Sequence, residues 1–111
     1  MIELTDKIKS TLKELPNYVE DTFYKKLSDI EKNLEIGAEP EQAFHKRMKH
    51  NMHPVLQMKL GSDYRAWFIE GKYIKQLEDD KIYGIMALTK DDQTKLSRKI
   101  DNVINFFERV L

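Results

Sequence analysis

The apolar residues of this chain change their spacing at Pro54, and this change divides the sequence into a helical part and a strand-forming part. Between residues 19 and 34 an apolar side chain recurs every three or four positions, which is the spacing of one helix face. From residue 55 the stretch "VLQMKL" alternates instead, with Leu56, Met58 and Leu60 on one side, which is the period of a strand. The two periods together predict an α+β fold.

The first half of the chain is predicted to form a short strand and a helical hairpin. The strand is residues 2 to 5. The first helix covers residues 8 to 15 and stops at Pro16, and the second follows the apolar stripe of residues 19 to 34 up to Gly37. The remaining elements are expected in this order: a short helix from Pro40 that carries Ala43, Phe44 and Met48; strands at 55–60 and 64–69 joined by the turn "GSD"; a strand or hairpin arm at 72–78; a central strand at 82–88; and a helix capped by Thr89 that continues past Phe107.

These elements predict a single domain of residues 1 to 111, in which a small antiparallel sheet is packed by the N-terminal helical hairpin and by the C-terminal helix. The chain has no cysteine, which excludes disulfides, thiolate catalysis and cysteine-bound zinc. No apolar stretch approaches the length of a membrane span, and the charged N-terminus does not fit a signal peptide. We therefore expect a cytoplasmic protein with no membrane partner.

Positive charge is concentrated in the middle of the chain. Residues 44 to 75 hold 7 Lys or Arg against 2 Asp or Glu, a net charge of +5, although the whole chain has a net charge of 0. Such a basic segment predicts contact with a polyanion, and its alternative is a solvated surface that keeps the protein soluble. The candidate RNA contacts in this segment are Lys46, Arg47, Lys49, His50 and His53.

All three histidines of the chain, including His45, belong to the same segment and could supply a general base. Their spacing matches no standard metal site and no carboxylate lies among them, so no metal is expected. Because they are predicted to lie on a loop, we expect them to matter less than an arginine on a strand.

Three phrases of the sequence resemble the RelE/HigB superfamily of bacterial toxins from type II toxin–antitoxin systems, whose relatives include the ParE gyrase inhibitors. The phrases are "IELTDKIKSTLKELP", "LQMKLGSDYRAWFI" and "IYGIMALTKDDQTKLSRKI". The resemblance implies a RelE-like fold and a metal-independent mRNA endoribonuclease that acts on translating ribosomes. It also implies that the enzyme needs no cofactor and is held inactive by a cognate antitoxin protein.

The resemblance further implies the chemistry and the residues that perform it. The ribose 2′-hydroxyl would attack the adjacent phosphorus while basic side chains stabilise the developing charge. By position, Arg65 would clamp the phosphate, because a guanidinium can make two hydrogen bonds to it. Lys59 and Lys90 match further basic positions, and Tyr83 is a candidate for a stacking or proton-transfer role.

Each of these interpretations has an alternative. Arg65 could be an ion-pair partner of a carboxylate in the sheet, and Trp67 and Tyr83 could be core residues. The sequence pI of 6.8 and the two aspartates after Lys90 favour a non-catalytic RNA- or protein-binding module of the same fold. A ParE-like gyrase inhibitor is a further possibility. The apolar side of the C-terminal helix either docks the antitoxin or closes the domain's own core.

Overall fold

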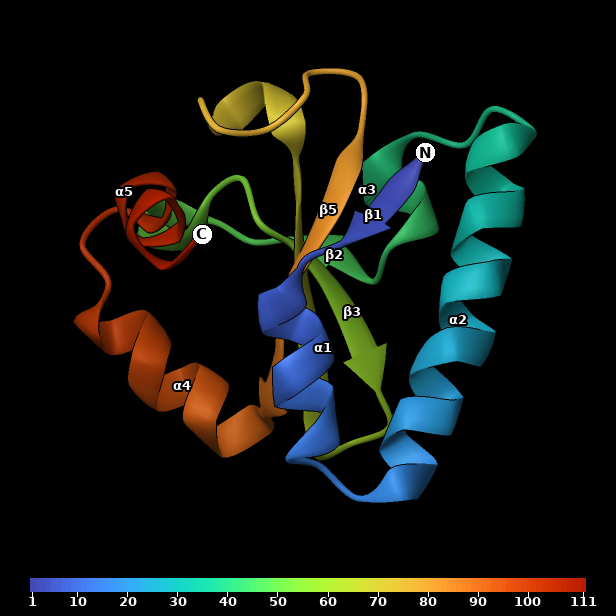
Figure 1. Cartoon of the computed structure of the whole chain (residues 1–111), viewed down its shortest axis with the longest axis horizontal. Helices are drawn as coiled ribbons and strands as arrows, with labels where there is room; N and C mark the ends of the chain where they lie inside the picture. The colour runs from blue at the N-terminus through green and yellow to red at the C-terminus, as the bar shows by residue number, and fades with distance from the viewer.

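The computed structural model describes residues 1 to 111, which form one five-stranded sheet with helices on both faces (Figure 1). The expected α+β class is therefore confirmed. None of the helices combines the length and the apolar character that crossing a membrane requires. The strands are β1 (Ile2–Leu4), β2 (Lys46–Arg47), β3 (Leu56–Leu60), β4 (Tyr64–Glu70) and β5 (Ile82–Thr89); the helices are α1 (Asp6–Lys13), α2 (Asn17–Glu35), α3 (Pro40–Ala43), α4 (Lys90–Lys99) and α5 (Val103–Val110), with 3₁₀ turns at His50–Met52 and Gly71–Tyr73.

The sheet is mixed, with the strand order β1-β5-β4-β3-β2. Strand β1 runs parallel to β5, while the other neighbours are antiparallel, so the expectation of an antiparallel sheet is wrong for this one edge. The chain passes through three α-helices and three strands between β1 and β5, and a connection of this length allows either direction. The prediction that residues 82 to 88 form an interior strand is confirmed.

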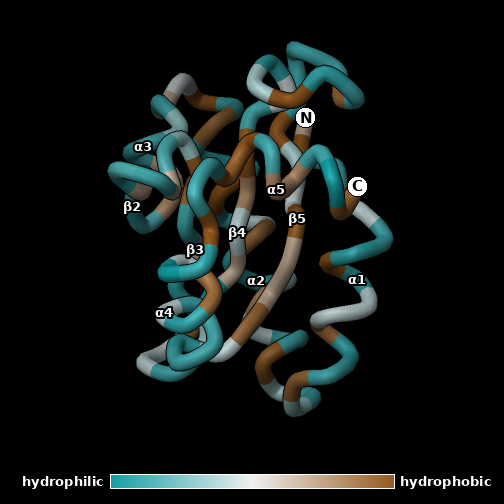
Figure 2. Tube along the Cα trace, turned by 90° about the vertical axis from the view of Figure 1, so that its left-hand side faces the viewer, coloured by the Kyte–Doolittle hydropathy of each residue, from teal (hydrophilic) through white to brown (hydrophobic).

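Alternation along the strands sends apolar side chains into two separate cores. On one face Met58, Ala66 and Phe68 pack with residues of α1 and α2, among them Phe23. On the other face Trp67 packs with residues of α5 and of the segment before it. Figure 1 shows the sheet standing between α2 on one side and α4 and α5 on the other, and in Figure 2 the strands carry long hydrophobic stretches. Strand β4 therefore carries large apolar groups on both faces, such as Phe68 on one and Trp67 on the other.

The segment around Phe44 differs from its prediction. The helix that begins at Pro40 ends at Ala43, because Phe44 turns into an extended conformation and buries its ring 4.9 Å from that of Phe68. Lys46 and Arg47 then pair with β3 as the edge strand β2. The core contact of Phe44 therefore overrides the helical spacing that links it to Met48 in the sequence.

The segment of residues 72 to 78 is not a strand or hairpin arm. It consists of a 3₁₀ turn and further turns, in which Ile74 is buried in the second core. Gln76 Nε2 donates a hydrogen bond to the carbonyl of Glu108 in α5 at 2.8 Å. The segment covers one end of α5 instead of extending the sheet.

The expected C-terminal helix is divided into α4 and α5 by residues 100 to 102. Asn102 begins α5 by accepting a hydrogen bond from the N–H of Asn105, and the side chain of Asn51 donates to the carbonyls of Ser97 and Ile100 at the end of α4. The break turns Phe107 toward Trp67, with 6.2 Å between the ring centres. The apolar side of α5 therefore closes the domain's own core at Phe107.

Arg47 fixes the edge strand β2 to two other elements. Its Nη1 donates to Glu70 of β4 at 2.6 Å and to the carbonyl of Pro54 at 2.9 Å, while Nε donates to Glu41 of α3 at 2.8 Å. The hydrogen bond with Arg47 lowers the pKa of the Glu41 carboxyl. Both carboxylates are thus committed to Arg47, which joins α3, β2 and β4.

The buried ring of Phe107 gives a first prediction. Phe107→Ala should lower the free energy of unfolding by about 3–5 kcal/mol, because it leaves a cavity in the second core. The partly exposed neighbour Phe106 provides a matched control, and Phe106→Ala should cost about 1 kcal/mol. Urea unfolding measures both, and equal losses would contradict the assignment of Phe107 to the core.

The Arg47 network gives a second prediction. Arg47→Met should destabilise the protein by about 2–4 kcal/mol, because the Glu70 side chain, which is only 13% exposed, would lose its partner. Lys46→Met, at the neighbouring exposed position without an ion pair, should stay within about 0.5 kcal/mol of the original chain. Adding Glu70→Gln to Arg47→Met should restore part of the loss in the same urea experiment. No recovery would mean that the pair does not act as a unit.

Candidate functional site

Lys59 of β3 and Arg65 of β4 lie directly opposite each other in the sheet. Opposite residues of an antiparallel pair point to the same face, with their Cβ atoms about 5 Å apart, and like charges in this position repel. The four ion pairs of the chain involve other residues, namely Arg47 and Lys81 with their carboxylates. The site is therefore built on two adjacent cations, Lys59 and Arg65, that have no carboxylate counterion; we call them the cation pair.

The side chain of Arg65 is held by backbone carbonyls. Although it is charged, the residue is only 7% exposed, and Nη1 donates to the carbonyls of Gly61 at 3.0 Å and Tyr64 at 2.7 Å. Gly61 has φ of 68°, a conformation that glycine adopts at little cost, and this turn brings the carbonyls toward the guanidinium. The alternative of an ion pair with a carboxylate is therefore not what fixes Arg65.

This anchoring leaves one edge of the Arg65 guanidinium free. Nε and Nη2 make no hydrogen bond within the protein, and no buried side-chain nitrogen or oxygen of the chain lacks a partner. Each of these two nitrogens therefore keeps some contact with solvent, although the residue as a whole is only 7% exposed. In Arg47 the corresponding nitrogens, Nε and Nη2, both donate to one carboxylate oxygen of Glu41. This contact shows how the Nε–Nη2 edge of a guanidinium holds an anionic oxygen. Arg65 thus presents two donors in a fixed orientation to an incoming oxyanion.

Next to this pair, the face of the sheet is covered by α4. Trp67 Nε1 and Gln57 Nε2 both donate to Gln93 Oε1 of α4, at 2.8 and 3.0 Å. Trp67 is fully buried, so its ring is a core group and not a surface for stacking bases. Lys46 lies opposite Gln57 and therefore belongs to the same face as Lys59. The exposed Lys46 extends the line of cations toward the sheet edge.

The other predicted RNA contacts on this segment divide into two groups. Lys49 and His50 are exposed and, together with Lys46, line a depression of about 340 Å³ beside β2. His53 is exposed beyond it. Arg47 lines the same depression, but its guanidinium is occupied by two carboxylates and is not free for a ligand.

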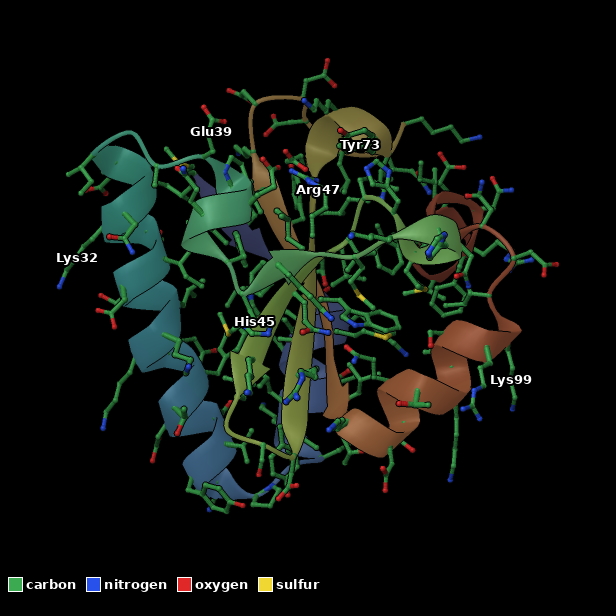
Figure 3. All side chains as sticks on the ribbon, turned by 180° about the vertical axis from the view of Figure 1, so that it is seen from behind. Lys32, Glu39, His45, Arg47, Tyr73 and Lys99 are labelled. Atoms are coloured by element: carbon green, nitrogen blue, oxygen red, sulfur yellow. The ribbon has the colours of Figure 1, made fainter.

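His45 lies closer to the cation pair than the sequence indicated. Its N–H donates to the carbonyl of Gln57 at 2.9 Å, which places it beside β3, and Figure 3 shows it between α2 and the strands. Although the residue as a whole is exposed, partial desolvation of the imidazole lowers the pKa of His45, and the positive charge of Lys59, among other nearby cations, lowers it further. The neutral form of the imidazole, which can accept a proton, is therefore favoured. No spacing in the sequence distinguishes it from the other two histidines, because its position depends on the burial of Phe44.

Lys90 and Tyr83 lie at opposite ends of the sheet. The N–H of Lys90 donates to the carbonyl of Asp63 at 2.7 Å, so this exposed lysine is at the same end as Arg65, with Asp63 and Asp91 close by. Tyr83 lies opposite Ile69, four residues along β4 from Arg65, or about 13 Å. Its hydroxyl accepts a hydrogen bond from the N–H of Glu78. Tyr83 is thus not brought to the cation pair.

The site therefore combines an anchored arginine, an unpaired lysine and a neutral imidazole, which suits the binding of a phosphate and the acceptance of a proton. No three or more His, Asp or Glu side chains of the structure are grouped so that they could hold a metal ion. Comparison with known proteins finds no matching family model, no matching curated protein and no matching solved structure.

Proposed function

We propose that this chain is a toxin of a type II toxin–antitoxin system, of the RelE/HigB kind, which cleaves mRNA on translating ribosomes without a metal. The observation that carries the proposal is the cross-strand pair of Lys59 and Arg65, which has no carboxylate partner, with the neutral His45 beside it. The order of elements supports it as well, since a strand, a helical hairpin, three antiparallel strands and C-terminal helices are what the resemblance implies.

In the proposed reaction Arg65 and Lys59 hold one phosphate of the RNA. The 2′-oxygen of the preceding ribose attacks the phosphorus, the bond to the 5′-oxygen breaks, and a 2′,3′-cyclic phosphate and a 5′-hydroxyl result. His45 accepts the proton of the 2′-hydroxyl, and the leaving 5′-oxygen takes up a proton from solvent. The charge that develops on the non-bridging oxygens is stabilised by the free edge of Arg65 and the ammonium of Lys59.

The cognate antitoxin should cover this same surface. A segment that carries Asp or Glu would supply the counterions that Lys46, Lys59 and Arg65 lack within the chain. Covering the cations would block access of RNA, which is the simplest form of inhibition that the charges allow.

A second candidate function is a non-catalytic RNA- or protein-binding module. It is favoured by the zero net charge and by the two aspartates around Lys90, which weaken attraction of RNA at that end of the sheet. A binding module would bind RNA without producing new transcript ends.

A gyrase inhibitor of the ParE kind is the third candidate function. It would be toxic to the host while leaving transcripts intact.

The cation pair gives a third prediction. Induced expression in a bacterial host should stop growth and produce new transcript ends by primer extension. Arg65→Lys keeps the charge but loses the two-donor edge, and Lys59→Ala removes an exposed charge without a partner in the protein. Each should reduce cleavage of purified RNA by about tenfold or more, equivalent to about 1.4 kcal/mol of transition-state binding.

Arg98→Lys, an exposed arginine on α4, is the matched control for Arg65→Lys and should keep full activity. Thermal unfolding of each variant separates loss of activity from loss of folding, and Lys59→Ala is the cleaner test because Lys59 holds no part of the fold. Normal growth on induction, or full cleavage by Lys59→Ala and Arg65→Lys, would refute the proposed enzyme.

The proton-accepting role of His45 gives a fourth prediction. His45→Gln should reduce RNA cleavage by about a hundredfold, since a general base typically contributes at least that factor, while RNA binding stays within about twofold. For His45 this reverses the expectation from the sequence that the histidines matter less than the arginine, because His45 lies beside β3. His53→Gln, at an exposed position away from the cation pair, should leave both unchanged. A His45→Gln variant that cleaves normally would show that another group, or water, accepts the proton.

A further inference from the structure

A cleft of about 310 Å³ lies between α2 and the outer side of β3. It exists because β2 pairs only with Leu56 and Gln57, so the rest of β3 has no strand neighbour on that side. Buried side chains, including Phe44 and Met58, form an apolar floor. The polar residues that line it are Lys26, Asp29 and Asn33 of α2, His45, and Lys59 of β3.

The charges in this cleft are not balanced within the protein. Lys26 lines the cleft from α2. Lys59, which lies on the α4 face of the sheet with Arg65, lines it at the edge of β3 that β2 leaves unpaired, and neither lysine takes part in an ion pair. Asp29 is the single carboxylate among the lining residues. An anion between the two lysines would supply the missing negative charge.

We propose that this cleft binds a phosphorylated nucleoside, with its phosphate between Lys26 and Lys59 and its sugar and base along α2. The proposal goes beyond the proposed cleavage, because occupancy of the cleft requires no bond to break. The cleft shares Lys59 and His45 with the reaction described above, whereas Lys26, Asn33 and Asp29 have no role in it, so the test of the site uses Lys26.

The size and the lining of the cleft select a nucleotide over a bare phosphate. Its volume is at the lower end of small-molecule sites, which begin at about 300 Å³, and the two lysines occupy only part of the lining. Asn33 can both donate and accept hydrogen bonds, and Asp29 can accept from a ribose hydroxyl or a base N–H. Phe44 and Met58 offer apolar surface to the sugar or base. A bare phosphate would use none of these groups.

His45 reports on occupancy of the cleft. The charged groups that face it are Lys26 and Asp29 of α2, Lys46 of β2, Lys59 of β3 and Arg65 of β4. Burial and these cations hold the pKa of the imidazole below its ordinary value. A phosphate between Lys26 and Lys59 offsets their charge, so the pKa of His45 should rise when the cleft is filled.

The fifth prediction tests the site by titrating the protein with adenosine 5′-monophosphate while the ring protons of His45 are followed by NMR. We expect saturable shifts at His45 and an increase in its pKa. Lys26→Ala should weaken binding by about tenfold, the value of one hydrogen bond to a charged group. Lys25→Ala removes another exposed lysine one position away, outside the cleft, and should bind as the original chain does.

Further titrations identify the source of the nucleotide. Adenosine and inorganic phosphate should each bind more weakly than adenosine 5′-monophosphate, because each uses only part of the cleft. A short single-stranded oligonucleotide that binds more tightly, with the same dependence on Lys26, would identify the site as one for a nucleotide of an RNA strand. Tighter binding of the mononucleotide would identify a free nucleotide as the ligand.

Shifts that do not saturate, or equal binding by Lys26→Ala and Lys25→Ala, would overturn the proposal. The result is distinct from that for the proposed function. A chain that binds the mononucleotide through Lys26 but cleaves no RNA keeps this site and loses the nuclease. A chain that cleaves RNA but whose binding of the mononucleotide ignores Lys26 loses this site alone.

Discussion

The two hydrogen bonds that Gln93 accepts, from Trp67 and from Gln57, determine where α4 crosses the sheet. One carboxamide oxygen satisfies an indole N–H that is fully buried and an amide that is nearly so, and leaving either donor unpaired would cost about 1–3 kcal/mol. The part of this face that α4 covers therefore ends near Gln57. Lys59, the next residue of β3 on the same face, is exposed. The open surface of the site is thus a consequence of how the second core is closed.

Two arginines of the chain show why residue type alone does not identify a binding group. Arg47 and Arg65 both lie on strands and both are largely removed from solvent. Arg47 is neutralised by Glu41 and Glu70, so its charge serves the fold. Arg65 is anchored by carbonyls, which orient the guanidinium but leave it a full positive charge and two free donors. The difference lies in the partners: the carbonyls that anchor Arg65 belong to its own hairpin, whereas Glu70, one of the two carboxylates that neutralise Arg47, is 23 residues away in the sequence.

The sequence therefore predicted the elements whose signals are local, and failed where partners are distant. The helical hairpin, the interior strand and the cap at Thr89 follow from periodicity and short-range hydrogen bonds, and all are present. The break before α5 is invisible to periodicity, because the apolar stripe continues across it from Ile100 to Val103. The parallel pairing of β1, the edge strand β2 and the position of His45 depend on tertiary contacts, of which the burial of Phe44 is the clearest.

The zero net charge of the chain does not conflict with a site for polyanions. At physiological ionic strength charges interact over about 8 Å, so the local arrangement matters more than the total. The carboxylates that form ion pairs do so with Arg47 and Lys81, and the pair of Lys59 and Arg65 is left without one. Repulsion between two adjacent cations costs stability in the free protein and is relieved when an anion binds between them. A fold that keeps such a pair on a rigid hairpin, with one member anchored through backbone carbonyls, is already oriented for a phosphate.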